Sequence, residues 1–319
     1  MNRKGVFFTI LSIFVSVMLI AMFTYQNQFP VDSDVEINTL RITFFHDFNN
    51  DLKNSYLERA LYVSVYNALD YATIYADSNL FFSSDSDIET FLDTCLKGTN
   101  PACGIDASFT HWVDKIKDKV YDDFKIDLTY SISGDVILSQ TIPFSIHVSI
   151  PVTYTLSDDF VLRLWNSEVL DAEVSITGLI DPLLLKQLSI NRRIIRDPML
   201  ELRDDDNANP HDDFVSHYNS GTYVMSDFGP SFLMRLKGSL ANSTLGLQTL
   251  LKVGEVVHQA NMSYIDYKYI KGEEYLCASI YTNLYNIDTI NTNFRIGRFD
   301  TFELYKLGDL LEITEADCG

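Results

Sequence analysis

The chain has 319 residues, with 24 Lys and Arg against 44 Asp and Glu, a net charge of −20 at pH 7. Phosphate would be repelled over such a surface, which excludes nucleic acid as the main partner. With 46% hydrophobic and 13% aromatic residues, the chain can bury a large core, which excludes an intrinsically disordered protein.

The first predicted element is a membrane helix over residues 6–25. This stretch carries no charge, and 12 of its residues are Val, Ile, Leu or Phe. Its helical length, about 30 Å, matches one hydrocarbon core. Arg3 and Lys4 precede it and residues 26–34 hold no Lys or Arg, so the N-terminus should be cytoplasmic and the bulk extracytoplasmic. We therefore predict a single-pass protein of the cell membrane that contacts lipid through residues 6–25.

A cleaved secretory signal peptide is the alternative to this anchor. Such peptides have an apolar core of roughly 7–15 residues, followed by a cleavage site of small residues. The core in this chain is longer, and Ala21-Met22-Phe23 is a poor cleavage site. The pattern favours a helix that is retained.

Residues 26–124 are predicted to form a helical region. A long amphipathic helix is expected to reach about Tyr75, because apolar residues recur every three or four positions. Two further helices are expected at 88–96, with residues 83–87 as its N-terminal cap, and at 109–124. The residues of the long apolar stripe are Ile37, Leu40, Phe44, Phe48, Leu52, Tyr56, Ala60 and Val63.

Four cysteines, an even number in a chain predicted to lie outside the cytoplasm, indicate disulfides. Three pairings are possible, and we expect nearest neighbours to pair, Cys95 with Cys103 and Cys277 with Cys318. Gly98, Asn100 and Pro101 provide turn residues inside the first loop. A four-cysteine zinc site is the alternative, but the sequence lacks the C-x-x-C pair that such sites use.

Residues 125–203 are predicted to form an antiparallel sheet, since β-branched and aromatic residues alternate with polar ones. Gly134 and Asp135 suggest a hairpin turn between the first two strands. Helices followed by strands indicate an α+β fold, with the long helix packed on the sheet. The four expected strands cover residues 126–131, 136–140, 144–156 and 173–179.

Residues 204–213 are predicted to be an acidic linker before a second, smaller C-terminal α+β lobe at 214–319. Strand-rich stretches in this lobe are expected at 263–281 and 293–304. The linker is also the best candidate for a cation site, but a solvated loop is the more usual explanation of such a charge run, so we expect no metal site. The acidic and imidazole side chains concerned are Asp204, Asp205, Asp206, His211, Asp212, Asp213 and His217.

The sequence shows no known catalytic or cofactor-binding motif. It contains no G-x-S-x-G, no phosphate-binding glycine loop and no dinucleotide fingerprint, so we expect no catalytic residue and no cofactor.

A few other residues suggest a site or a position in the fold. Asn242 and Asn261 begin glycosylation sequons, which are meaningful outside the cytoplasm. Trp112 and Trp165 could form a carbohydrate or protein contact surface, or pack in the core. His147 alternates with apolar residues, which favours a strand position over a general base.

An ordered set of sequence patches begins with Arg3-Lys4-Gly5 before Val6-Phe7-Phe8 and continues through residues 57–72, 143–158, Trp165, 174–184, 229–240, 242–251 and 263–269. In this order the patches resemble archaeal membrane proteins with a class III, prepilin-type signal. The resemblance implies that a prepilin peptidase cuts between Gly5 and Val6 and leaves the hydrophobic helix in place. The chain differs in having Ile10 where many pilins have Glu, which favours a minor or tip subunit over a major pilin.

These observations predict a non-enzymatic cell-surface protein that is pilin-like or a pilus or surface-assembly subunit. Its partners would be other pilin-like or assembly-platform proteins. The alternative is a surface receptor or adhesin that binds a sugar, peptide or cation through the C-terminal lobe.

Overall fold

The computed structural model describes residues 33–78, 80–158, 163–197, 210–257 and 262–273, with short strands at 284–287, 296–297 and 313–315. Contacts divide the chain into two compact units, residues 1–54 and 55–319. The predicted membrane helix at 6–25 lies outside the described residues. Within the described ranges, no helix combines the length and the apolar character of a membrane span.

Helical backbone runs from Ser33 to Ser78 in three consecutive elements, which confirms the predicted long helix. These are α2 (Ser33–Asp51), the π-helix η1 (Leu52–Leu57) and α3 (Glu58–Ser78). The predicted apolar stripe is wrong at Leu40 and Phe44, which are 67% and 45% exposed. It is also wrong at Tyr56, which is 51% exposed, whereas Leu52 and Leu57 are buried. A π-helix bonds residue i to residue i+5, so it shifts the buried face by one position. A search for apolar residues spaced three or four apart does not detect the five-residue spacing between Leu52 and Leu57.

The face of α3 that is buried combines large and small apolar side chains. Leu61, Val65 and Leu69 are fully buried, and each contributes roughly 1.5–3 kcal/mol by leaving water. Ala68, Ala72 and Ala76 recur every fourth residue on the same side. Their small side chains allow other elements to approach the helix closely. The elements that α3 contacts include β4, α4, α5 and α6.

Two shorter helices follow, α4 (Asp85–Leu96) and α5 (Phe109–Phe124), separated by the 3₁₀ turn η2 (Ile105–Ala107). Ser84 caps α4 by accepting a hydrogen bond from the Asp87 N–H, and the Asp87 carboxylate accepts one from the Ser83 N–H. This reciprocal arrangement confirms the predicted cap at 83–87. The bounds of α5 are those expected from the sequence.

The sheet is antiparallel, as predicted, but the hairpin at Gly134 and Asp135 is wrong. Strands β1 (Ile126–Ile132) and β2 (Ile137–Ile142) both pair with β3 (Ser145–Asp158), not with each other. They lie one after the other along one edge of β3, while β4 (Arg163–Ser175) pairs with its other edge. The predicted strand at 173–179 captured only the end of β4, because polar residues occupy much of its first half.

The break between β1 and β2 has a local cause in β3. Pro151 accepts a hydrogen bond from the Ser133 N–H through its carbonyl, so its backbone faces this edge. Because proline has no N–H to donate there, the ladder is interrupted at that point. Gly134 lies against the proline ring, and a Cβ at this position would come within 2.7 Å of Pro151 Cγ. A glycine is therefore required where the chain bends past the proline.

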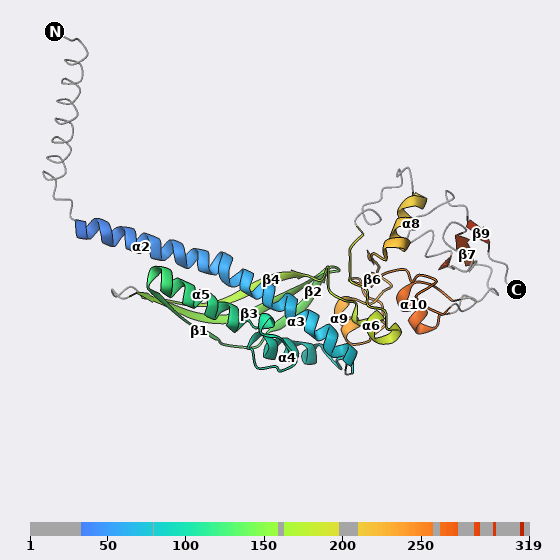
Figure 1. Ribbon diagram of the computed structural model, residues 1–319, viewed down its shortest axis with the longest axis horizontal. Helices are drawn as coiled ribbons and strands as arrows, with labels where there is room; N and C mark the ends of the chain where they lie inside the picture. The colour runs from blue at the N-terminus through green and yellow to red at the C-terminus, as the bar shows by residue number, and fades with distance from the viewer. Residues whose placement is uncertain are drawn as a thin grey trace, which may run out of the picture. The chain divides into compact units, whose positions relative to one another are not determined.

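Side chains alternate strictly across β3 and β4. Even-numbered residues such as Ile146, Val148 and Val174 are buried, on the side where α3, α4 and α5 contact the sheet (Figure 1). Tyr130 of β1 ties α5 to this side by donating to the Thr110 carbonyl and the Asp114 carboxylate, each at 2.9 Å. Odd-numbered residues form the opposite face, which we call the open face.

After β4 the described chain is built from short helices and strands. The helices are α6 (Pro182–Leu188), α8 (Pro210–Ser220), α9 (Phe232–Leu236) and α10 (Asp266–Lys271). The strands are β5 (Val224–Met225), β6 (Leu247–Gln248), β7 (Leu284–Ile287), β8 (Ile296–Gly297) and β9 (Ile313–Glu315). The strand-rich prediction for 263–281 is wrong at α10, which ends at Gly272 with φ +69°. Glycine adopts this left-handed conformation without strain, which stops the helix.

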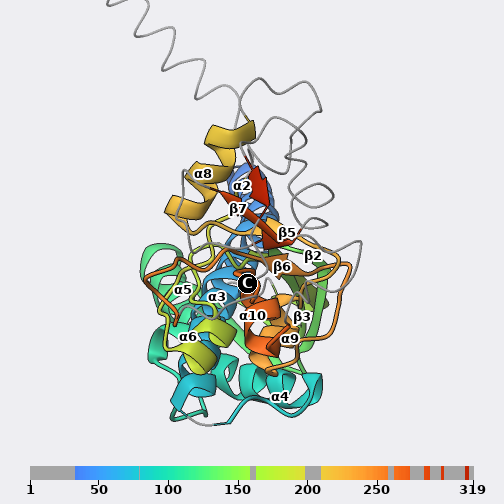
Figure 2. The same ribbon diagram turned by 90° about the vertical axis from the view of Figure 1, so that its right-hand side faces the viewer.

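A buried ionic cluster joins three of these helices, which lie close together in Figure 2. The Arg235 guanidinium of α9 lies 2.6 Å from the Asp181 carboxylate and 2.7 Å from that of Asp266, and none of the three side chains is exposed. Tyr223 donates a hydrogen bond to Asp181 at 2.9 Å. Asp181 also caps α6 by accepting from the Leu183 N–H. Burial raises the pKa of Asp266, and the charge of Arg235 opposes that shift.

Candidate functional site

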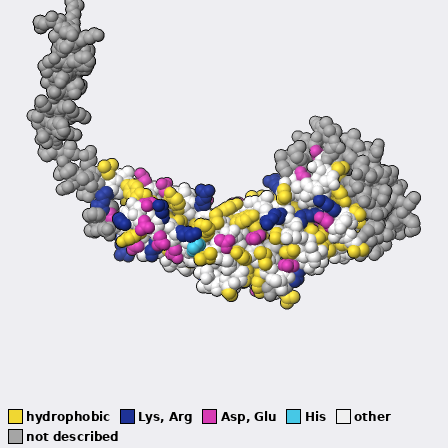
Figure 3. All heavy atoms as spheres, viewed as in Figure 1, with side chains coloured by type: hydrophobic (Ala, Val, Ile, Leu, Met, Phe, Trp, Pro, Cys, Tyr) yellow, Lys and Arg dark blue, Asp and Glu magenta, His cyan; other side chains and the backbone are white. Residues whose placement is uncertain are grey.

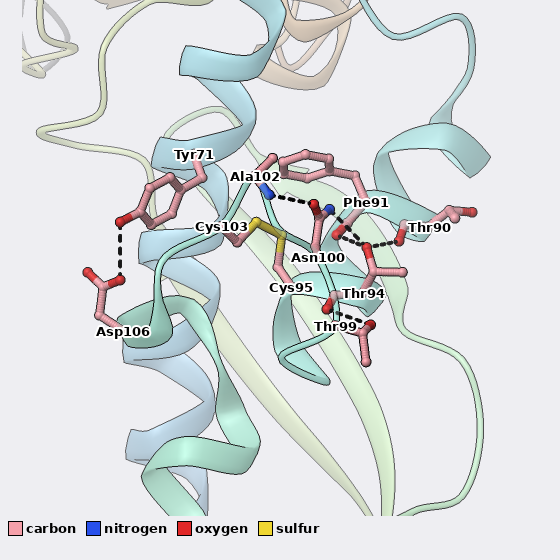
Figure 4. Close-up of a disulfide and its surroundings, with 10 residues drawn as sticks. All are labelled: Tyr71, Thr90, Phe91, Thr94, Cys95, Thr99, Asn100, Ala102, Cys103 and Asp106. Atoms are coloured by element: carbon pink, nitrogen blue, oxygen red, sulfur yellow. Dashed lines mark hydrogen bonds between the residues drawn. A yellow bond between two sulfur atoms is a disulfide. The ribbon is translucent and has the colours of Figure 1, made fainter.

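A disulfide loop at the end of α4 organises the candidate site. Cys95 and Cys103 are joined by a disulfide, with Cα atoms 5.6 Å apart, which is the first of the two pairs expected from the sequence. Cys277 and Cys318 lie outside the described residues. The loop between the paired cysteines runs back along α4 (Figure 4).

Hydrogen bonds hold this loop in one conformation. The Asn100 side chain donates to the Thr94 hydroxyl at 3.0 Å and accepts from the Ala102 N–H at 3.0 Å, as Figure 4 shows. The Thr94 carbonyl accepts from the N–H groups of Thr99 and Asn100. Satisfied backbone groups and a covalent link together make the loop a rigid rim.

An aromatic groove of about 660 Å³ lies on one side of this loop, between α4 and the segment that follows α3. The rings of Tyr75, Phe82 and Phe91 contact one another, with centroids 5.1–5.5 Å apart. Leu80, at the edge, is 83% exposed. Hydroxyl and amide groups surround the rings, at Ser78, Ser83, Thr90, Thr94 and Asn100. An apolar floor with a polar rim is typical of a site that holds an apolar side chain of a partner.

A second hollow, of about 400 Å³, is lined by residues of the same loop, including Cys95, Asn100 and Cys103, and by residues of α5. His111 and Asp114 contribute its polar groups. Close by, the Asp106 carbonyl accepts hydrogen bonds from Asn67 at 3.0 Å and from Trp112 at 2.9 Å. Trp112 is thus a structural residue that fastens η2 to α5.

Asp70, on the neighbouring turn of α3, carries a buried carboxylate oxygen that has no hydrogen-bond partner. Burial raises the pKa of Asp70, the charge of Arg193 opposes the shift, and Asp106 adds to it. A carboxyl whose pKa is higher in the folded state than in the unfolded state destabilises the fold once it ionises. The penalty is absent below the unfolded pKa of 3.8 and is complete above the folded pKa.

We therefore expect Asp70→Asn to raise the melting temperature at neutral pH, because the amide removes the buried charge. The gain should shrink as the pH falls toward 3.8, where the carboxyl of the parent chain is protonated. Thermal unfolding of both chains at several pH values measures this difference. Asp77→Asn, at an exposed position of the same helix, is the control and should change little. A lower melting temperature for Asp70→Asn at pH 7 would contradict the electrostatic account.

The structure separates the residues suggested as a cation site. Pro210 to Asp213 form the first turn of α8. His217 is fully buried, 3.2 Å from Asp197 and 2.8 Å from the Thr222 hydroxyl, so its inclusion in a solvated cation loop is wrong. Residues 204–209 lie outside the described residues. Across the described ranges, no group of three His, Cys, Asp or Glu is placed to hold a metal ion.

The remaining predicted positions fall in different places. Asn242 is exposed in the loop between α9 and β6. Gly5, Val6 and Asn261 lie outside the described residues. His147 is on the open face of the sheet, 3.5 Å from Asp171. Trp165 is also on the open face and is 69% exposed.

Sequence reasoning missed the aromatic groove. Its signal was present in the run of Leu80, Phe81 and Phe82, which follows the end of a helix where a polar turn is the usual composition. Comparison of the chain with protein-family models, with curated proteins and with solved structures gave no match.

Proposed function

We propose that the chain is a non-enzymatic, membrane-anchored cell-surface protein, a pilin-like or surface-assembly subunit that acts through protein contacts. The observation that carries this proposal is the character of α2. Leu40, Ile42 and Phe44 are large apolar residues, and they are 67%, 44% and 45% exposed. In Figure 3, hydrophobic side chains lie among the charged ones on the visible face of this helix.

The exposed apolar residues of α2 do not form one stripe. Leu40 and Ile42 are two positions apart, about 200° around the helix, so they point to nearly opposite sides. A helix that is apolar on several sides is normally surrounded by protein or lipid. Because α2 begins eight residues after the apolar segment 6–25, we infer that helices of neighbouring subunits surround it close to the membrane.

The aromatic groove supports the same proposal from the second unit. The exposed Leu80 and the aromatic side chains of the groove floor offer an apolar contact beside the disulfide loop. Both surfaces suit a subunit that is built into an assembly. The receptor or adhesin alternative gains no comparable support from the described part of the C-terminal lobe.

Site-specific photo-crosslinking in cells tests the proposal. A benzoylphenylalanine at position 40 should form adducts with a second copy of this chain or with another protein that begins with the same kind of basic, glycine and apolar segment. The same residue at position 119, an exposed lysine of α5, is the control and should form few adducts. No adduct from position 40, or equal adducts from both positions, would overturn the proposal.

A further inference from the structure

The open face of the sheet carries a small hollow that the proposed function does not use. It has a volume of about 250 Å³ and lies where β1, β3 and β4 run side by side. The register places Thr129, Thr155 and Trp165 in one row across the three strands. The next row begins with Ser131 and Thr153, whose hydroxyls are 2.6 Å apart.

The composition of this hollow is unusual for so acidic a chain. All seven residues that line it are Thr, Ser, Tyr or Trp, so no charged side chain takes part, although the whole chain carries a net charge of −20. A cation site would need carboxylates and an anion site would need Arg, Lys or a helix N-terminus. Neither is found in the lining. The chemistry selects a neutral ligand.

Trp165 indicates which kind of neutral ligand fits. Its indole is 69% exposed and stands at one end of a row of threonine hydroxyls. A flat aromatic ring can stack on the apolar C–H face of a pyranose, while serine and threonine hydroxyls both donate to and accept from sugar hydroxyls. Pockets for drug-sized ligands measure roughly 300–1,000 Å³, so this smaller hollow suits one sugar ring at a time.

From this arrangement we propose that the open face binds a neutral saccharide, with one pyranose ring stacked on Trp165 and its hydroxyls bonded to Thr129, Ser131, Thr153 and Thr155. The ligand is an uncharged saccharide, one ring of which occupies the hollow. This inference does not rest on the proposed assembly role. An assembly subunit and a soluble fragment would both bind the sugar.

The two tryptophans allow a direct test by fluorescence. In Trp112→Phe, Trp165 is the single remaining tryptophan, and its emission should shift when soluble oligosaccharides of glucose, mannose, galactose or N-acetylglucosamine are added. At least one of these probes should give a saturable shift. Thr155→Val keeps the shape and the strand preference while removing one hydroxyl. It should weaken binding about three- to tenfold, the effect of one hydrogen bond.

Calorimetry on Trp165→Ala completes the test. The heat of binding seen with the parent chain should be lost, while the thermal unfolding of the variant stays close to that of the parent because the side chain is exposed. The inference is overturned if none of the four probes shifts the emission, if Trp165→Ala still binds, or if a charged polysaccharide alone is bound. It is also overturned if sedimentation shows a dimer that Trp165→Ala dissociates, since the face would then belong to a second copy.

Discussion

Replacing Arg235 with methionine is expected to lower the free energy of unfolding by about 3–5 kcal/mol, the effect of breaking a buried ion pair. The variant leaves Asp181 and Asp266 facing each other without a cation, although both side chains are fully buried. Water cannot reach them to replace the guanidinium. Because the two ion pairs of Arg235 also hold α6, α9 and α10 together, the C-terminal part of the second unit should become less stable as a whole.

Urea denaturation followed by circular dichroism measures this loss. Lys237→Met is a matched control, because Lys237 lies two residues from Arg235 and also forms an ion pair. Its partner is the Asp85 carboxylate at 2.8 Å, and the Asp85 side chain is 62% exposed. A surface pair of this kind contributes at most about 1 kcal/mol. Arg235→Met/Asp266→Leu should recover part of the loss by removing one uncompensated carboxylate. Equal effects of Arg235→Met and Lys237→Met would contradict the role assigned to the cluster.

Removing the described disulfide is expected to have the next largest effect. Changing Cys95 and Cys103 to serine frees a loop with a sequence separation of 8, which corresponds to about 2.5 kcal/mol of loop-closure entropy. The rim of the aromatic groove should open with it, since Asn100 and Thr94 are held in register by the link. Increased hydrogen exchange at residues 97–103 should therefore accompany the lower stability.

Denaturation in buffer without added oxidant or reductant compares the stability of the double-serine variant with that of the parent chain. Ala102→Ser, an exposed position in the same loop, keeps the bridge and serves as the control. The slope of the transition should stay constant if only stability has changed. A double-serine variant with parental stability and unchanged exchange would show that the hydrogen bonds of Thr94 and Asn100 hold the loop unaided.

Local patterns predicted the helices and the fold class well. The cap at Ser84, the bounds of α5 and the antiparallel alternation of β3 follow from neighbours in the sequence. The errors arose where a regular pattern is interrupted. Strand order depended on the missing N–H of Pro151, and the buried stripe of the long helix depended on a π-turn at Leu52–Leu57 that periodicity does not reveal.

The candidate site was predictable only in part. The spacing of Cys95 and Cys103 was enough to expect their link. The groove was not foreseen, because Tyr75, Phe82 and Phe91 come from three segments that only tertiary packing brings together. The buried cluster had no sequence signal, since Asp181, Arg235 and Asp266 are separated by 54 and 31 positions in a chain rich in acids. The sequence around a single charged residue does not show whether its side chain will be buried.

The central claim is that an N-terminal apolar helix stays in the membrane after prepilin-type processing and carries the described body outside. N-terminal sequencing of the protein purified from the membrane fraction tests it most directly. The account predicts a chain that begins at Val6, with residues 6–25 retained. A chain recovered without this segment, beginning beyond residue 25, would contradict it.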